Sequence, residues 1–151
     1  MSTRTSASES TPRPTGSHLA LRAVIVAALV VDAVVHFRLA GGYQQSAPTG
    51  IGAGNLFRIE AAAALLVAGW VAMRWTRASL LAAFAVGLSA VVAVVLYRYV
   101  NIPAVGPLPA MYEPVWFTEK SLSAVAEAVA AAGAGLGLLQ QRRDRLNSER
   151  P

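Results

Sequence analysis

Residues 78–97, ASLLAAFAVGLSAVVAVVLY, form a run of twenty residues without a charged side chain. A helix needs about 20 predominantly apolar residues to cross the hydrocarbon core of a bilayer. Three further apolar stretches accompany this run, and we predict helices at about 18–40, 54–73, 78–100 and 118–140. Four such stretches in 151 residues leave almost no polar surface for a water-soluble protein. The predicted fold class is therefore all-α, a bundle of four transmembrane helices.

Composition supports this interpretation. Hydrophobic residues make up 55% of the chain and charged residues 14%, whereas a soluble domain carries about 25% charged residues. The chain has no cysteine, which excludes disulfides, thiolate metal sites and thiol catalysis. Residues 1–17 are rich in Ser, Thr and Pro, and we expect a disordered tail there. Residues 18–140 would form the membrane domain, and 141–151 a basic tail.

The arginines predict the orientation of the helices. Cytoplasmic segments of membrane proteins carry an excess of Lys and Arg. Nine of the 13 basic residues fall on the side that holds both termini and the turn between the second and third helices, namely Arg4, Arg13, Arg22, Arg74, Arg77, Arg142, Arg143, Arg145 and Arg150. We therefore expect an up-down-up-down topology in the cell (plasma) membrane, with both termini cytoplasmic. The net charge of +5 then indicates topology and affinity for anionic lipid headgroups, and no nucleic-acid partner is expected.

Small residues and prolines predict how the helices pack and connect. Gly133 and Gly137 form a GxxxG pair, and Ala83 and Gly87 have the same spacing. Such residues let helix backbones approach closely, and we expect packing within one chain rather than dimerisation. Residues 100–117, VNIPAVGPLPAMYEPVWF, hold four prolines and cannot form a continuous helix. We predict an ordered segment at the outer mouth of the bundle, serving as a lid or a plug, and a mobile Gly-rich loop at about 41–55.

Ionisable side chains within the predicted helices point to function, because they are costly in a bilayer. From a rise of about 1.5 Å per residue, Asp32 and Glu127 lie about 12–13 Å below the outer ends of their helices. His36 and Glu60 lie about 6–9 Å below. We expect these four groups to face a polar cavity that opens outward. The complete set of ligand-binding or polar-cluster candidates is Asp32, His36, Glu60, Glu127, Arg38, Arg58, Arg98 and Glu119.

Solvation cost predicts that these groups are paired. Asp32 is expected to pair with His36 or with an arginine. Glu60 or Glu127 is expected to pair with one of the outer arginines, Arg38, Arg58 or Arg98. For those arginines and for Lys120, extension of the charged group toward lipid headgroups is the favoured interpretation of each residue taken alone.

A metal site is a weaker possibility. Asp32, His36, Glu60 and Glu127 would supply N and O ligands suited to zinc, manganese or iron. Their spacing is not diagnostic and no ExxH pair exists, so the sequence predicts no metal and no particular cofactor. Asp32 and Glu127 are alternatively placed for acid–base chemistry, since a carboxyl group in an apolar cavity tends to keep its proton.

Three stretches carry a resemblance to known proteins: DAVVHFRLAGGY (32–43), NLFRIEAAAALL (55–66) and EKSLSAVAEAVA (119–130). They resemble small four-span integral membrane proteins of high-GC actinobacteria, most of which have no assigned role. More loosely, the architecture is similar to that of DoxX-like four-helix membrane proteins, some of which are linked to quinone or redox partners. This second resemblance concerns the fold, and a shared fold does not establish function.

Three functional hypotheses remain open at this stage. The first is an accessory protein whose outward-facing cavity binds a lipid-like small molecule or a partner membrane subunit. The second is a small membrane enzyme that performs acid–base or metal-assisted chemistry on a quinone- or isoprenoid-like substrate. The third is a purely structural bundle in which buried ion pairs fix the register of the helices. The sequence does not decide whether the chain is an enzyme.

Overall fold

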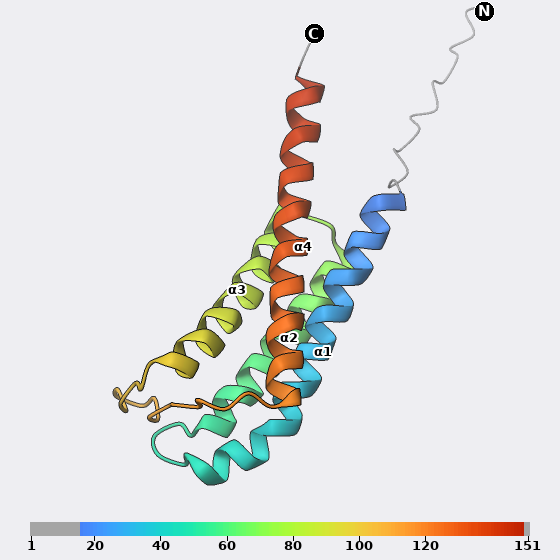
Figure 1. Cartoon of the computed structure of the whole chain (residues 1–151). Coiled ribbons are helices and arrows are strands. Elements are labelled where there is room, and N and C mark those ends of the chain that lie inside the picture. The colour runs from blue at the N-terminus through green and yellow to red at the C-terminus, as the bar shows by residue number, and fades with distance from the viewer. Residues whose placement is uncertain (1–15, 150–151) are drawn as a thin grey trace, which may run out of the picture.

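The computed structural model describes residues 16–149, and within this range the chain forms four α helices and no strand. These are α1 (Gly16–Ser46), α2 (Ala53–Met73), α3 (Arg77–Tyr99) and α4 (Thr118–Ser148). The all-helical fold class is confirmed. The start of α1 and the end of α4 lie at one end of the molecule, and residues 47–52 and 100–117 lie at the other, which we call the loop end (Figure 1). Nearly all of the predicted tail at 1–17 falls outside the described residues.

Helix α1 ends at Ser46, several residues beyond its predicted end. The two glycines after residue 40 favoured an earlier end, because each destabilises a helix by about 1 kcal/mol. Contacts with α2 outweigh that cost. The rings of Tyr43 and Phe57 lie 4.3 Å apart, and the side-chain oxygen of Gln44 accepts a hydrogen bond of 3.1 Å from the backbone N–H of Asn55. The link to α2 is correspondingly short.

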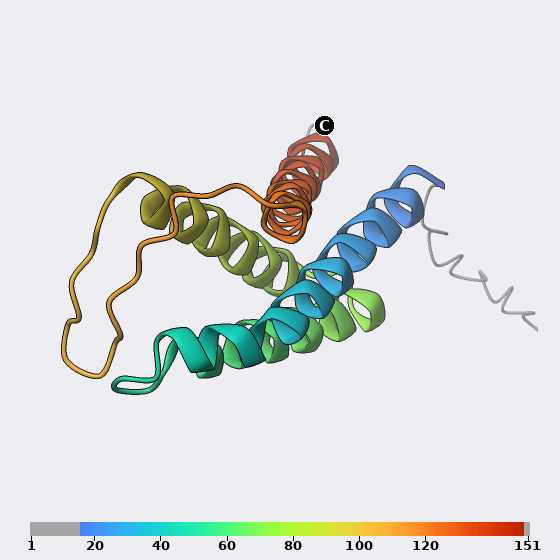
Figure 2. The ribbon, with the colours of Figure 1, turned by 60° about the horizontal axis from the view of Figure 1, so that its bottom comes forward.

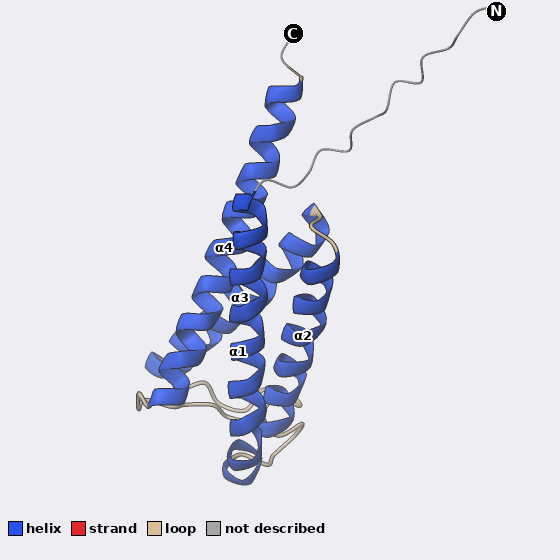
Figure 3. Cartoon of the chain, turned by 90° about the vertical axis from the view of Figure 1, so that its right-hand side faces the viewer, coloured by secondary structure: helices blue, strands red, loops and turns tan. Residues whose placement is uncertain are grey.

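Helix α4 also continues past its predicted end near residue 140. Residues 141–148 were expected to belong to the basic tail, but they are helical and largely exposed. The last turns of α4 extend beyond the other helices (Figure 3). Gln141, at the base of this extension, donates a hydrogen bond of 3.3 Å to the backbone carbonyl of Trp75.

The small residues bring helix backbones together within the chain. A Cβ atom on Gly87 of α3 would lie 2.8 Å from the backbone carbonyl oxygen of Glu127 on α4. The two glycines of the GxxxG pair face different neighbours. A Cβ on Gly133 would lie 2.9 Å from Ile25 of α1, whereas one on Gly137 would lie 3.1 Å from Leu80 of α3. The predicted role in intramolecular packing is confirmed for these positions.

Large apolar side chains are exposed on the outside of the bundle, while two carboxyl groups are buried inside it. Phe37, Leu66 and Met73 are 68–76% exposed, whereas Asp32 and Glu127 are each 1% exposed. All four helices are long and apolar enough to cross a membrane. Large apolar surface outside and carboxyl groups inside is the arrangement that lipid favours.

The four helices do not pack evenly. Helix α1 packs along both α2 and α4, and α3 packs along α4, but α2 and α3 contact one another much less. Figure 2 shows α3 (yellow-green) diverging from α1 and α2 toward the loop end. The bundle is therefore most open between α2 and α3.

Residues 100–117 form an ordered segment across this open region. Two isolated antiparallel bridges, Ile102 with Met111 and Val105 with Leu108, fold it back on itself. Its tip is held by a hydrogen bond of 2.8 Å from the backbone N–H of Ile51 to the carbonyl oxygen of Pro107. As predicted, this proline-rich segment is not helical, and it covers the loop end (Figures 1 and 2).

Candidate functional site

A cluster of four polar side chains lies between α1 and α4. Asp32 and His36 are four residues apart on α1, and Ser123 and Glu127 are four residues apart on α4. Residues at this spacing project from one face of a helix. Because α1 and α4 pack together, the two faces meet, and all four side chains are buried. We call these residues the polar cluster.

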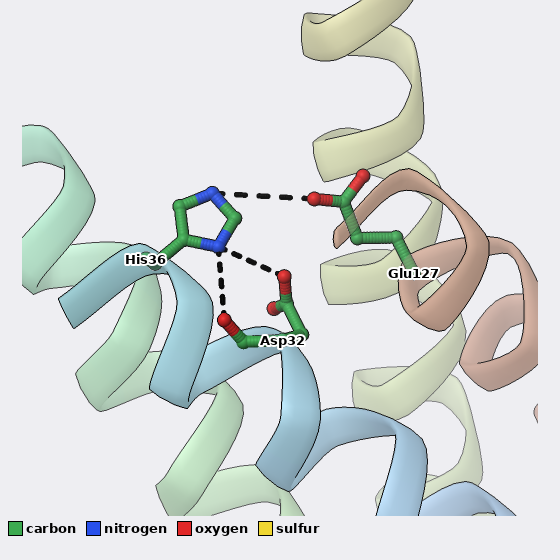
Figure 4. Close-up of side chains that lie close together, drawn as sticks. All are labelled: Asp32, His36 and Glu127. Atoms are coloured by element: carbon green, nitrogen blue, oxygen red, sulfur yellow. Dashed lines mark hydrogen bonds and ion pairs between the residues drawn. The ribbon is translucent and has the colours of Figure 1, made fainter. Parts of the chain in front are cut away.

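His36 is oriented by Asp32. Its Nδ1 lies 2.8 Å from Asp32 Oδ1 and 3.2 Å from the backbone carbonyl oxygen of Asp32 (Figure 4). A carbonyl oxygen only accepts hydrogen bonds, so Nδ1 carries a proton and donates it toward Asp32. The other ring nitrogen, Nε2, faces Glu127 Oε1 at 4.0 Å. That separation is too long for a direct hydrogen bond.

Ser123 joins the two carboxyl groups. Its Oγ lies 2.9 Å from Asp32 Oδ1 and 2.7 Å from Glu127 Oε1. A hydroxyl group has one proton and can donate to one of these oxygens at a time. The other contact needs a proton on a carboxyl group or a cation beside it. Glu127 Oε2 is buried and has no hydrogen-bond partner among the described residues.

A cavity of about 560 Å³ begins beside the polar cluster and extends to the loop end. Its walls come mainly from apolar side chains of α1, α2 and α3 and from residues 110–113 of the loop segment, whereas α4 contributes Lys120 and Ser123. His36 and Ser123 reach it from the polar cluster, and Glu60 reaches it from α2. The ring of Phe57 contacts His36 edge to face, with centroids 5.0 Å apart. The site thus combines mainly apolar walls with a polar deep end at His36, Ser123 and Glu60, and Lys120 and Glu113 line the cavity toward the loop end.

The loop segment is tied to the helices around this cavity. The Tyr43 hydroxyl donates to Glu113 Oε2 at 3.4 Å. Lys120 is buried and donates to the backbone carbonyl oxygens of Glu113 and Val115. Its ammonium group also lies 5.4 Å from the centre of the Trp116 ring. The predicted extension of Lys120 to lipid headgroups is therefore wrong, because carbonyl oxygens of the loop accept hydrogen bonds from its ammonium group inside the protein.

The structure brings together three of the candidates that the sequence singled out, Asp32, His36 and Glu127, with Ser123 between them. The prediction that Asp32 pairs with His36 is confirmed. Glu60 is half-buried in the cavity wall outside the polar cluster, and its Oε1 has no hydrogen-bond partner among residues 16–149.

The outer charged candidates lie elsewhere. Arg38, Arg58 and Glu119 are exposed, and Arg58 donates to Asn55 on its own helix at 2.7 Å. Arg98 is half-buried and lies 5.0 Å from the centre of the Tyr99 ring. The expected pairing of Glu60 or Glu127 with one of these arginines is therefore wrong in the described part of the chain. A long guanidinium side chain is better solvated at the surface of the molecule than when it follows a carboxyl group inward.

Two polar contacts at the helix ends were not anticipated. Arg22 on α1 donates to the backbone carbonyl oxygens of Val71 and Ala72 at the end of α2. The last carbonyl groups of a helix lack partners within the helix, and an arginine satisfies them well. The sequence holds no signal that aims Arg22 at α2 rather than at solvent, because the contact depends on how α1 lies along α2.

Comparisons of this chain with protein-family models, with curated proteins and with solved structures give no match. The resemblance to actinobacterial four-span proteins and to DoxX-like proteins therefore stays an expectation from the sequence.

Proposed function

We propose that this chain is an integral protein of the cell membrane with four spans, up-down-up-down, and both termini in the cytoplasm. Its apolar outer surface and the four long apolar helices support this proposal. The distribution of arginines supports the orientation, because Arg74 and Arg77 connect α2 to α3 at the end opposite the loop end. The cavity would then open toward the outer face of the membrane.

The proposed function is to bind a lipid-like small molecule, such as a quinone or an isoprenoid, in this cavity. The observation that carries the proposal is the 560 Å³ chamber with apolar walls and a polar deep end. Ligand cavities in proteins typically measure about 300–1,000 Å³ and combine apolar walls with a few polar groups that orient the ligand. Here Glu60, His36 and Ser123 are those polar groups.

The position of the cavity suits a ligand that arrives from the bilayer. Ile59 on α2 and Ser89 on α3 line the cavity and are also exposed on the surface of the bundle. They lie on the two helices that pack least against each other. A polar headgroup would reach His36 while an apolar tail passes between α2 and α3 into lipid.

The test is mass spectrometry of small molecules retained by the purified, detergent-solubilised chain. Ala93 of α3 lines the cavity, and Ala93→Phe would fill part of it. Ala85 is an exposed residue of the same helix outside the cavity, so Ala85→Phe is the matched control. We expect a lipid-like compound with the original chain and with Ala85→Phe, and its loss with Ala93→Phe. Equal retention by both variants, or retention of a protein subunit in place of a small molecule, would contradict this function.

A second candidate, a small membrane enzyme, is favoured by one observation. His36 is held by Asp32 at 2.8 Å, and it lines the cavity. An imidazole held in this way can transfer a proton to or from a bound molecule. The compound recovered from His36→Gln would then differ chemically from the one recovered from the original chain. The same compound in both preparations would support binding without catalysis.

A further inference from the structure

The polar cluster has more buried negative groups than positive groups to balance them. Asp32 and Glu127 are each 1% exposed. Within residues 16–149, His36 is the only basic side chain that pairs with either of them. One imidazolium balances one carboxylate, and Ser123 contributes no charge. An isolated carboxylate in an apolar environment is very unfavourable, so another positive charge must join the cluster.

Either a proton or a metal ion can supply that charge, and the donor set favours a metal ion. Asp32, His36 and Glu127 each offer a ligand atom, and these three atoms all lie within 4.8 Å of one another. Ligands held about 2.0–2.2 Å from one metal ion lie about 3–3.5 Å from each other. A single ring nitrogen of an imidazole binds one ion. His36 Nδ1 lies 2.8 Å from Asp32 Oδ1, slightly below that range, and the ligand atom of Glu127 lies within 4.8 Å of the other two. Small side-chain rotations are therefore sufficient.

A second observation points to a ligand at the same place. Glu127 Oε2 is buried without a hydrogen-bond partner in the described structure, although Ser123 already holds Oε1 of the same carboxyl group. An unsatisfied buried carboxylate oxygen is costly, and a rotation of the Glu127 carboxyl group that brings Oε2 or both oxygens to a cation removes that cost.

We propose that Asp32, His36 and Glu127 bind one divalent first-row transition-metal ion, such as Mn²⁺, Fe²⁺ or Zn²⁺. One imidazole and two carboxylates are ligands that suit these ions. Two carboxylates, a neutral imidazole and a divalent ion have no net charge, which is the state that a membrane interior tolerates best. Ser123, within hydrogen-bond distance of both carboxyl groups, orients them toward the ion.

The site adjoins the cavity through His36 and Ser123. Three protein ligands leave a coordination position free, as in metal sites that bind exogenous molecules. A polar headgroup in the cavity can occupy that position. This last step rests on the proposed function, whereas the metal site itself depends only on the polar cluster.

The decisive experiment uses Co²⁺ as a spectroscopic probe. The full-length chain, purified in detergent without a polyhistidine tag, is treated with a chelator and titrated with Co²⁺. We expect saturation at one Co²⁺ per chain, with visible absorption bands of a low-symmetry N/O site and competition by Zn²⁺. Binding should also release protons, because the ion replaces those held by the ligands. Absence of stoichiometric Co²⁺ binding to the unaltered chain would overturn the proposal and leave a protonated carboxyl group in the cluster.

Variants then assign the ligands. Asp32→Asn and Glu127→Gln keep the side-chain volume and should each weaken Co²⁺ binding by at least the roughly 10–100-fold that loss of an outer-shell partner costs. Glu119→Gln is the matched control, since it removes an exposed carboxyl group of α4 outside both the polar cluster and the cavity, and its affinity should stay within about twofold. Circular dichroism shows whether each variant is folded. Unchanged Co²⁺ affinity in folded Asp32→Asn and Glu127→Gln would place the ion elsewhere and refute the assignment.

The proposal of a metal site and the proposal of a lipid-binding cavity can be refuted independently. Ala93→Phe alters the cavity wall and none of the proposed metal ligands. If it loses the retained compound and still binds one Co²⁺, both proposals stand. If the original chain binds Co²⁺ but retains no compound, the lipid-binding function fails and the metal site stands.

Discussion

Replacement of Gly87 by alanine tests whether the close approach of α3 and α4 holds the polar cluster in place. The new Cβ would lie 2.8 Å from the backbone carbonyl oxygen of Glu127 and 3.0 Å from the backbone nitrogen of Ala131. Optimal non-bonded contacts are about 3.5–4.0 Å, so the two helices must separate by roughly 0.5–1 Å. Backbone atoms cannot rotate away as a side chain can. Overpacking of this kind costs about 1–3 kcal/mol.

Alanine also stabilises a helix relative to glycine, by about 0.8–1 kcal/mol. Gly69 on α2 separates the two effects, because a Cβ there would meet nothing within 4 Å. Gly69→Ala gains the helix propensity without the clash. The difference in the free energy of unfolding between the two variants is therefore the overpacking cost, about 1–3 kcal/mol.

The assay is thermal unfolding of both variants in the same detergent, followed by circular dichroism. At about 2–4 °C per kcal/mol for a chain of this size, Gly87→Ala should melt roughly 2–12 °C below Gly69→Ala. It should also bind Co²⁺ more weakly, because the displaced backbone carries Glu127. A Gly87→Ala variant that melts at or above Gly69→Ala would refute the argument that this contact positions α3 against α4.

Two further substitutions probe the polar cluster and the core. Ser123→Ala removes the hydroxyl group between the two carboxyl groups and should lower the free energy of unfolding by about 1–3 kcal/mol. The control Ser121→Ala, at an exposed position two residues earlier, should change it by less than about 0.5 kcal/mol. Equal effects of the two variants in denaturant titrations would argue against a structural role for the polar cluster. Leu80→Ala, at a fully buried position, should cost about 2–5 kcal/mol. Its neighbour Leu81 is 49% exposed, and Leu81→Ala should cost clearly less in the same titration because it leaves no internal cavity.

Local spacing predicted much of the candidate site. Asp32 and His36 are four residues apart and were expected to interact on one helix face, which the distance of 2.8 Å confirms. Ser123 and Glu127 have the same spacing and also contact each other, at 2.7 Å. Both contacts lie within a single helix, whose geometry repeats every 3.6 residues whatever surrounds it.

Contacts between helices were less predictable. An arginine was expected to pair with Glu60 or Glu127, and Lys120 was expected at the bilayer surface. In the structure, Lys120 turns inward to the loop carbonyls, and Glu127 faces His36 at 4.0 Å. The length of a lysine or arginine side chain lets it reach in several directions. Its partner is decided by which backbone carbonyls or carboxyl groups the packed helices bring within that reach.

The sequence by itself determined that there are four long apolar helices, where their carboxyl and imidazole groups lie along each helix, and that a proline-rich segment joins the last two. Only the tertiary structure decided that α1 and α4 turn their polar faces toward each other, and that α3 diverges from α2 to leave a cavity beside His36. The physical reason is the range of the interactions. Helix formation and side-chain spacing depend on residues a few positions apart. The rotation and crossing of helices depend on distant small residues, such as Gly87 against the backbone of Glu127, whose fit exists only once the chain has folded.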